Sequence, residues 1–391
     1  MHLPSFLHDL NIPVLEYHAL LRAWCRMMRD EQPVAYDDDH QVWVVFRYED
    51  GLRVRDNYEV FSSAQNLGDS NFPSIAGMDP PRHSQMRSLV TQALSARTIA
   101  TMSPQVEAIS ADLLRRALPS GEMDWVTDLA HPLPIQVITQ MLGLPFDAWA
   151  QYRYWADLIV NQRPEWSQAV QGFWQVFTQA IEAHQQHPQQ DVLSLLIAAE
   201  VEGKRLSFME LMGFCFTLFI AGYITTANLL GNAILCFIEH PEALEQLRQN
   251  PALLPKAIEE ILRYMHPVRG NPGIKLVEGR VATADTCLGG QTIRAGEHVR
   301  IDHYSMNFDE QVFANPECFD IARSPNRHQG FGHGIHFCIG APLARLEARV
   351  ALGMMLEQLQ DMRVIQDEPL RQFDSLLFLG PQRLPLVFRP A

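Results

Sequence analysis

The chain has 391 residues, of which 47% are hydrophobic and 19% charged, and this composition is that of a soluble globular protein with a large core. No window approaches the ~20 apolar residues of a membrane-spanning helix, and the N-terminus lacks the basic start and apolar block of a secretion signal. A net charge of −14 argues against nucleic acid as a partner. We therefore expect a cytoplasmic protein without a membrane anchor.

Helical periodicity dominates the chain, so we predict a mainly α protein. The predicted helices span residues 99–118, 150–184, 207–240, 241–266 and 341–362. Short alternating or β-branched runs predict a small β part. These runs lie at 41–48, 286–293, with a turn at Gly289-Gly290, and 384–388. No linker, low-complexity tract or repeat divides the sequence, so we predict a single domain over residues 1–391.

The segment 207–240 is apolar nearly all round, which predicts a buried central helix. Its interior contains AGYITT, with Gly222, Thr225 and Thr226. A glycine inside a helix costs about 1 kcal/mol relative to alanine. Two interpretations stay open. Gly222 allows close packing while the threonines bond back to the preceding turn, or the helix opens locally to face a bound ligand.

Six cysteines, at positions 25, 215, 236, 287, 318 and 338, form no CxxC pair, which argues against a disulfide framework and against zinc-finger spacing. Cys338 lies within FGHGIHFCIG, residues 331–340, which we call the Cys loop. The predicted helix 341–362 begins directly after this loop, with Pro342 tolerated in its first turn. A thiol near a helix N-terminus is favoured as thiolate.

Three interpretations compete for Cys338: a buried structural thiol, a catalytic nucleophile and a metal ligand. A nucleophile needs a histidine base oriented by a third group, and His336, two residues away, is poorly placed for that task. A zinc site needs further thiolates or histidines at matched spacing. A single thiolate that accepts backbone N–H bonds and is shielded by Phe331 and Phe337 suits a haem iron.

The Cys loop meets the pattern FxxGxHxCxG in full, and from about residue 33 to residue 387 the chain resembles the cytochrome P450 family of haem-thiolate monooxygenases, of the soluble bacterial type. The resemblance implies the cytochrome P450 fold, mainly α with a small β part. It also implies haem b (iron protoporphyrin IX) between the long central helix and the helix after the Cys loop. Cys338 would be the iron ligand.

The resemblance implies further roles for charged residues. EEILR and FDIAR supply Glu260, Arg263 and Arg323, which would form a structural ion network. The haem propionates need charge-assisted bonds in an apolar pocket. The residues that the resemblance assigns to haem binding are His83, Arg87, Arg280, Phe331, His336, Cys338 and Gly340. Without the Cys loop, these charges would be read as solvated surface groups.

AGYITT is similar to the AGxETT or AGxDTT segment of the family, which implies catalytic roles for Gly222, Thr225 and Thr226. Thr225 would order water and protons beside bound dioxygen. Ile224 stands where an acid is expected, and an isoleucine cannot relay a proton. Proton delivery would then use Thr225, ordered water or the substrate. The alternative is that peroxide, rather than dioxygen, is the oxidant.

The resemblance implies insertion of one oxygen atom from O2 into a small molecule, by hydroxylation or epoxidation. Mostly apolar residues at the family's pocket positions predict a lipophilic substrate. These residues are Phe72, Ile75, Phe219, Tyr223, Ile224, Val268, Leu376 and Phe378. The connection between Pro267 and Arg280 is longer than usual, and it forms either a turn over the cavity, a partner contact or an idle surface loop.

No flavin or nicotinamide fingerprint occurs in the chain, so we expect electrons from a separate ferredoxin or flavodoxin-type donor with its reductase. Two rival classes remain open. A peroxide-driven peroxygenase or a haem isomerase would act without a reductase. A non-catalytic haem-binding sensor would bind ligands without oxidising them.

Overall fold

The computed structural model of the chain describes residues 3–64, 74–161, 163–269, 279–365, 368–375 and 377–391. The chain falls into two compact units. The first unit consists of Met1–Asp69, Gly231–Cys338 and Arg363–Leu384, and the second of Ser70–Leu230, Ile339–Met362 and Pro385–Ala391. Each unit takes three separate segments of the chain, so no single cut in the sequence would separate them. The single-domain organisation stays a prediction.

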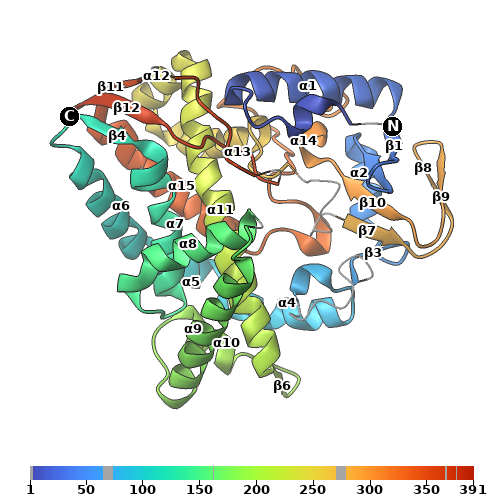
Figure 1. The fold of residues 1–391 in the computed structure, drawn as a ribbon, viewed down its shortest axis with the longest axis horizontal. Helices are drawn as coiled ribbons and strands as arrows, with labels where there is room; N and C mark the ends of the chain where they lie inside the picture. Colours follow the sequence, from blue (N-terminus) through green and yellow to red (C-terminus); the bar gives the residue numbers. More distant parts are fainter. Residues whose placement is uncertain (1–2, 65–73, 162, 270–278, 366–367, 376) are drawn as a thin grey trace. The chain divides into compact units, whose positions relative to one another are not determined.

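The first unit combines helices with a mixed sheet (Figure 1). Its elements are η1 (Ser5–His8), α1 (Val14–Glu31), β1 (Val34–Asp37), β2 (Val42–Val45), α2 (Tyr48–Asp56), β3 (Phe61–Ser62), α12 (Pro241–Gln249), η5 (Pro251–Leu253), α13 (Leu254–Tyr264), β7 (Gly279–Ala282), β8 (Thr286–Leu288), β9 (Gln291–Ile293), β10 (His298–Ile301), α14 (His303–Met306) and η6 (Gly334–His336).

The sheet of the first unit has five strands in the order β1-β2-β10-β7-β3. Strands β10 and β2 are parallel, with Val299 opposite Trp43, while the other three pairs are antiparallel. Alternating β-branched side chains place one face of this sheet in the core. The core contains Val45, Phe61, Val299 and Ile301 together with Tyr48 of α2.

The second unit is mostly helical (Figure 1). Its elements are η2 (Ile75–Gly77), α4 (Arg82–Ala93), α5 (Ala96–Thr101), α6 (Ser103–Ala117), β4 (Glu122–Asp124), the π-helix η3 (Val126–Ala130), α7 (Pro132–Met141), η4 (Phe146–Ala148), α8 (Trp149–Val160), α9 (Trp166–Gln186), α10 (Val192–Ala198), β5 (Glu200–Val201), β6 (Lys204–Arg205), α15 (Ala341–Gln358), β11 (Leu359–Val364) and β12 (Pro385–Pro390). Strands β11, β12 and β4 form a three-stranded sheet in that order.

Helix α11 (Phe208–Glu239) is the 32-residue helix that begins in the second unit and ends in the first. Its sequence is apolar nearly all round, as expected for a core helix. Within the described part of the chain it is the one helix long and apolar enough to cross a membrane, and half of its most apolar stretch is buried inside the protein. Trp125 ties it to the second unit, because the indole Nε1–H donates to the Leu230 carbonyl at 3.0 Å.

The mainly α class with a small β part is confirmed, but four predicted helices are interrupted or shorter than their periodicity suggested. The predicted helix 99–118 is interrupted at Met102, between α5 and α6. The predicted helix 150–184 is two helices, α8 and α9, and Pro164 lies between them. The predicted helix 241–266 is interrupted at Asn250-Pro251, where the proline lacks the N–H that a helix interior needs. The predicted helix 341–362 ends at Gln358 because Leu359 begins β11.

The predicted turn at Gly289 and Gly290 is confirmed. Both residues have positive φ, +54° and +78°, between the antiparallel strands β8 and β9. Two consecutive left-handed residues give the turn that matches the twist of a hairpin, and glycine adopts this conformation without strain.

A buried ion network joins α13 to the segment that leads to the Cys loop. Arg263 donates from Nε and Nη2 to the two carboxylate oxygens of Glu260, each at 2.8 Å. Nε of Arg323 lies 3.1 Å from both oxygens of the same carboxylate. The side chains of Glu260 and Arg263 are completely buried. The structure therefore brings together the three residues that the sequence assigned to a network.

The two guanidinium groups also hold backbone. They donate to the carbonyl oxygens of Asn307, Ala314, Asn315, Pro316 and Cys318. The Glu260 carboxylate in turn accepts from the backbone N–H of Asp320 and from Asn326 Nδ2. Because every one of these contacts lies within the first unit, Glu260 fixes the chain between about residues 307 and 326, which precedes the Cys loop.

We expect the Glu260→Gln variant to be strongly destabilised. The substitution leaves two largely buried guanidinium groups beside a neutral amide, and breaking a buried ion pair costs about 3–5 kcal/mol. The measurement is the free energy of unfolding in urea. The control is Arg389→Gln at the exposed Arg389–Asp361 pair, which should change that free energy by at most about 0.5 kcal/mol. Equal effects of the two substitutions would contradict a holding role for Glu260.

Candidate active site

Cys338 is an exposed thiol at the end of the Cys loop. Its backbone N–H donates to the Phe331 carbonyl at 2.8 Å, which closes the loop, and α15 begins three residues later with Gly340 as its N-cap residue. The rings of Phe331 and Phe337 lie on this loop with their centroids 6.2 Å apart. The loop therefore presents the sulfur beside aromatic surface, in front of a helix N-terminus.

The other thiols differ from Cys338 in their surroundings. Burial raises the pKa of Cys25 and Cys236 well above the usual thiol value, and that of Cys215 to about 12, because a thiolate is disfavoured away from water. Cys287 and Cys318 are exposed, but they lie outside the Cys loop. Of the six cysteines, Cys338 alone combines exposure with the loop motif.

Two glycines of the Cys loop are needed for packing. Gly332 and Gly334 have φ of +70° and +67°, a conformation that other residues adopt only with strain. A Cβ at Gly332 would lie 2.7 Å from Arg55 Nη1, and one at Gly334 would lie 2.9 Å from Asp56 Oδ1. The end of α2 thus occupies the space that side chains would take, and Arg55 itself donates from Nε to His303 at 2.9 Å.

The structure places the residues predicted to bind propionates on several elements. His336 lies on η6, where its Nε2 is 3.1 Å from the hydroxyl of buried Ser63. Arg280 lies on β7, is 2% exposed, and donates from Nη1 to the Gly279 carbonyl. His83 and Arg87 lie on α4 of the second unit, one turn apart on the same face. The propionate contacts of these residues stay a prediction.

An accessible stripe runs along the otherwise buried α11. Ala221 is exposed, Thr217 and Thr225 are partly exposed, and the three residues follow one another at a spacing of four along one face. The Thr225 hydroxyl donates to the Ala221 carbonyl at 2.7 Å. Thr226 is buried on another face. The packing of the second unit therefore leaves the Thr225 side of α11 open to a ligand.

The segment AGYITT is helical throughout in the structure. A Cβ at Gly222 would lie 2.7 Å from Ile138 Cδ1, so this glycine allows α7 to approach α11 closely. Thr225 bonds back to the preceding turn, as the packing interpretation of this segment expects. The accessible stripe is what the ligand interpretation expects, so the segment combines features of both.

The residues predicted to line the substrate pocket lie in three settings. Phe219 belongs to an aromatic cluster, with its ring centroid 4.8 Å from that of Phe173. Tyr223 and Ile224 are fully buried. Ile75 lies on η2, and the partly exposed Val268 and Phe378 pair as an isolated antiparallel bridge. Phe72, Leu376 and most of the long 267–280 connection lie outside the described residues. Their contact with substrate stays a prediction.

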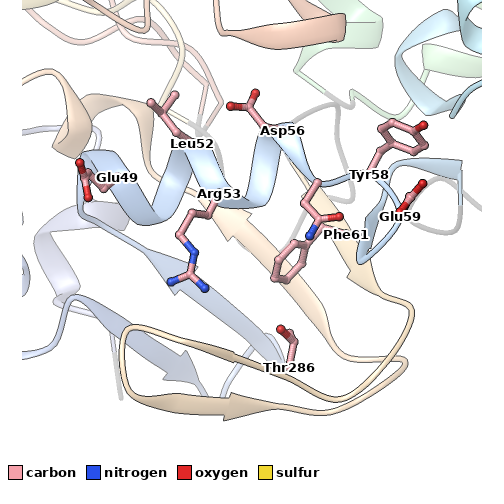
Figure 2. Close-up of a pocket in the computed structure, with 9 residues that line it drawn as sticks. Glu49, Leu52, Arg53, Asp56, Tyr58, Glu59, Phe61 and Thr286 are labelled. Atoms are coloured by element: carbon pink, nitrogen blue, oxygen red, sulfur yellow. The ribbon is translucent and has the colours of Figure 1, made fainter.

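A surface pocket of about 580 Å³ lies beside α2 in the first unit (Figure 2). Figure 2 shows Glu49, Leu52, Arg53 and Asp56 on α2, Tyr58, Glu59 and Phe61 on the chain after it, and Thr286 on β8. Neither Cys338 nor any residue predicted to touch substrate lines this pocket. It is therefore separate from the candidate active site.

Several residues that contact the predicted site residues were not predicted from the sequence. Ser63 beside His336 and Arg55 beside Gly332 are contacts across more than 250 residues of chain. His131 and Asp157, which bind the Tyr223 hydroxyl, were also missed. None of these residues carries a local motif, so only the folded structure could reveal them.

Known proteins are similar to this chain in sequence. The cytochrome P450 family profile matches residues 133–386, more than half of the chain. The chain is 36% identical over 390 residues to cyclomarin C epoxidase of Salinispora arenicola, an alignment that covers 94% of this chain and 96% of that one. It is 32% identical over 361 residues to mycinamicin IV hydroxylase/epoxidase of Micromonospora griseorubida, with 89% and 90% covered.

Solved structures of related proteins have the same fold as this chain. CYP109E1 from Bacillus megaterium, in complex with corticosterone, superposes with a TM-score of 0.88 at 35% identity, covering 95% of this chain and 99% of that one. The fold, the family profile and the named relatives lead to the same assignment. The chain belongs to the cytochrome P450 family and is a haem- and iron-binding monooxygenase with the cytochrome P450 fold.

Proposed function

We propose that this monooxygenase inserts one oxygen atom from O2 into a C–H or C=C bond of a lipophilic small molecule. The observation that carries the proposal is the exposed Cys338 thiol at the end of the Cys loop. Two relatives are named for an epoxidation and for a hydroxylation with epoxidation. A solved relative contains the steroid corticosterone, which supports an apolar substrate of similar size.

We propose haem b as the cofactor, and the residues fit this group. An iron porphyrin requires a soft ligand, apolar surface and partners for two carboxylates. Cys338 offers an exposed thiol. The accessible stripe of α11 is formed by the small side chain of Ala221 and by Thr217 and Thr225, which suits contact with a flat ring. Among the described residues no group of three His, Cys, Asp or Glu side chains offers a rival metal site.

The protein side chains would divide the work as follows. Cys338 would hold the iron as a thiolate, which the start of α15 stabilises through its unpaired N–H groups. His336, Arg280, His83 and Arg87 would bind the propionates. When bound, the haem supplies the redox centre at which dioxygen is activated. The Glu260 network would keep the chain before the Cys loop in place.

Thr225 would handle protons. Its hydroxyl lies on the accessible stripe and already donates to the Ala221 carbonyl, so its oxygen can accept a bond from a water molecule. Ile224, the residue at the usual acid position, is fully buried and carries no ionisable group. Protons would therefore reach the reaction through Thr225 and ordered water rather than through a carboxylate on α11.

Electrons would come from a separate ferredoxin or flavodoxin-type protein with its reductase, and the protein would work in the cytoplasm. A second candidate, a peroxide-driven peroxygenase, is favoured by Ile224, because peroxide supplies both the oxygen and the protons that the missing acid would deliver. The two candidates differ in whether product forms with peroxide alone.

The Cys338→Ser variant should lose the absorption band that marks thiolate-bound haem in the reduced, carbon-monoxide-bound protein. A serine hydroxyl is a poor iron ligand compared with a thiolate, so the loss follows from ligand chemistry. The control is Cys287→Ser, which removes another exposed thiol of the first unit and should leave the band intact. An unchanged band in Cys338→Ser would refute the proposed ligand.

The Thr225→Ala variant tests proton handling. Supplied with a ferredoxin, its reductase and testosterone as the probe, it should form product more slowly by at least about tenfold and release more peroxide per electron pair. Thr225→Ser keeps the hydroxyl and should retain most of the product yield. Equal product and peroxide yields in wild type and Thr225→Ala would exclude this role. Product formed with peroxide alone would favour the second candidate.

A further inference from the structure

A partly buried polar cluster lies against α11 in the second unit, and we call its four residues, His131, Arg153, Asp157 and Tyr223, the Tyr223 cluster. His131 and Tyr223 are buried, whereas Arg153 and Asp157 are partly exposed. The Tyr223 hydroxyl donates to Asp157 Oδ1 at 3.0 Å and lies 2.5 Å from His131 Nδ1. Nε of Arg153 is 3.7 Å from Asp157 Oδ2. The cluster therefore joins α11 to α8 and to the residue that precedes α7.

The direction of the hydrogen bonds follows from proton counting. A tyrosine hydroxyl has one proton, and in this arrangement Asp157 receives it. His131 Nδ1 must therefore carry a proton and donate to the tyrosine oxygen. Burial lowers the pKa of His131 to about 3, so its ring is neutral at physiological pH with that proton on Nδ1. Burial also raises the pKa of Tyr223, which keeps its proton.

The cluster lies on a different side of α11 from the accessible stripe. Residues two apart on a helix point about 200° away from each other, so Tyr223 and Thr225 face nearly opposite directions. Tyr223 is fully buried, whereas Thr225 is partly exposed. The two side chains thus lie on different sides of α11, so an effect of the Tyr223 hydroxyl on Thr225 would act through the helix.

A directional bond is valuable at this point because the rest of α11 offers little to set its rotation. Most of its contacts are apolar, and apolar packing is non-directional. The close contact of Gly222 with Ile138 of α7 is also apolar. Elsewhere in the described part of the second unit, α11 is tied by Trp125 at Leu230, by Arg82 of α4, whose Nη2 donates to Glu210 at 3.3 Å, and by a long 3.5 Å contact between Thr217 and Ser74. Tyr223 provides a tie within two residues of Thr225.

We propose that Tyr223 is a positioning residue: its hydroxyl, bound by Asp157 and His131, sets the rotation of α11 and thereby the place of the Thr225 hydroxyl. Tyr223 is adjacent to Ile224, the residue at the position where the family resemblance implies an acid. This inference rests on the proposed role of Thr225 in proton handling. The tie itself is a property of the protein fold and can be measured without turnover.

The test compares four variants of the haem-loaded protein. Tyr223→Phe removes the hydroxyl alone, and Asp157→Ala removes its acceptor. Asp157→Asn keeps an acceptor oxygen and serves as the conservative rescue. Tyr152→Phe is the matched control, because Tyr152 is a buried tyrosine of α8 that meets Phe219 of α11 through its ring, at a centroid distance of 5.9 Å.

The first readout is hydrogen–deuterium exchange of the backbone amides in residues 216–230. Loss of a net hydrogen bond corresponds to up to about a tenfold change in local opening. We expect Tyr223→Phe and Asp157→Ala to exchange about tenfold faster than wild type, and Asp157→Asn and Tyr152→Phe to stay within about twofold. Exchange in Tyr223→Phe and Asp157→Ala that equals exchange in Tyr152→Phe would overturn the tie.

The second readout is the fraction of electrons lost as peroxide with testosterone as the probe. Tyr223→Phe and Asp157→Ala should raise this fraction, while Asp157→Asn and Tyr152→Phe should not. Faster exchange without a rise in peroxide would overturn the positioning role. The reduced, carbon-monoxide-bound spectrum of the wild-type protein separates the two proposals. If this spectrum lacks the thiolate band, the proposed function is contradicted. Hydrogen–deuterium exchange still tests the tie in that case. If Tyr223→Phe fails to fold, Asp157→Ala compared with Asp157→Asn decides.

Discussion

The ion network around the Glu260 carboxylate is the interaction on which the first unit depends most. Two arginines and two further N–H donors, the Asp320 backbone and Asn326 Nδ2, converge on its two oxygens. A buried carboxylate is stable only with such compensation. The same arginines bind five backbone carbonyls that belong to the irregular chain before the Cys loop, a stretch with almost no helix or strand to satisfy its polar groups. One ion network thus substitutes for secondary structure.

Two glycines of the Cys loop, Gly332 and Gly334, also help to hold the loop in place. Their positive φ bends the chain tightly, and the missing side chains admit Arg55 and Asp56 of α2. The loop is therefore held from two directions within the first unit: by the ion network through the preceding chain, and by α2 through Gly332 and Gly334. A metal ligand needs a fixed position as well as suitable chemistry. For Cys338, the proposed iron ligand, these contacts supply the rigidity.

In the second unit, the sides of α11 differ in their exposure to solvent. One side is buried, mostly among apolar residues, and one stripe, which includes Thr225, stays accessible. A helix stabilised by apolar contacts alone would have a poorly defined rotation, because such contacts are tolerant of small shifts. The hydrogen bonds of the Tyr223 cluster are directional and supply this definition. The substitution of an apolar Ile224 at the usual acid position removes one polar group from this helix, and the cluster places polar contacts at the adjacent residue.

The sequence by itself determined the features that depend on local patterns: the mainly α class, the Gly289-Gly290 hairpin, the Cys loop motif and, through the resemblance, the cytochrome P450 family. It could not show where helices break by competition with a distant strand, as at Leu359, because β11 pairs with a strand that begins at Pro385. Tertiary structure alone decided which side chains surround the motifs. His131 and Tyr223 are separated by 92 residues, and Ser63 and His336 by 273. Periodicity reports only which face of an element is buried, whereas a hydrogen-bond partner is set by how distant elements pack.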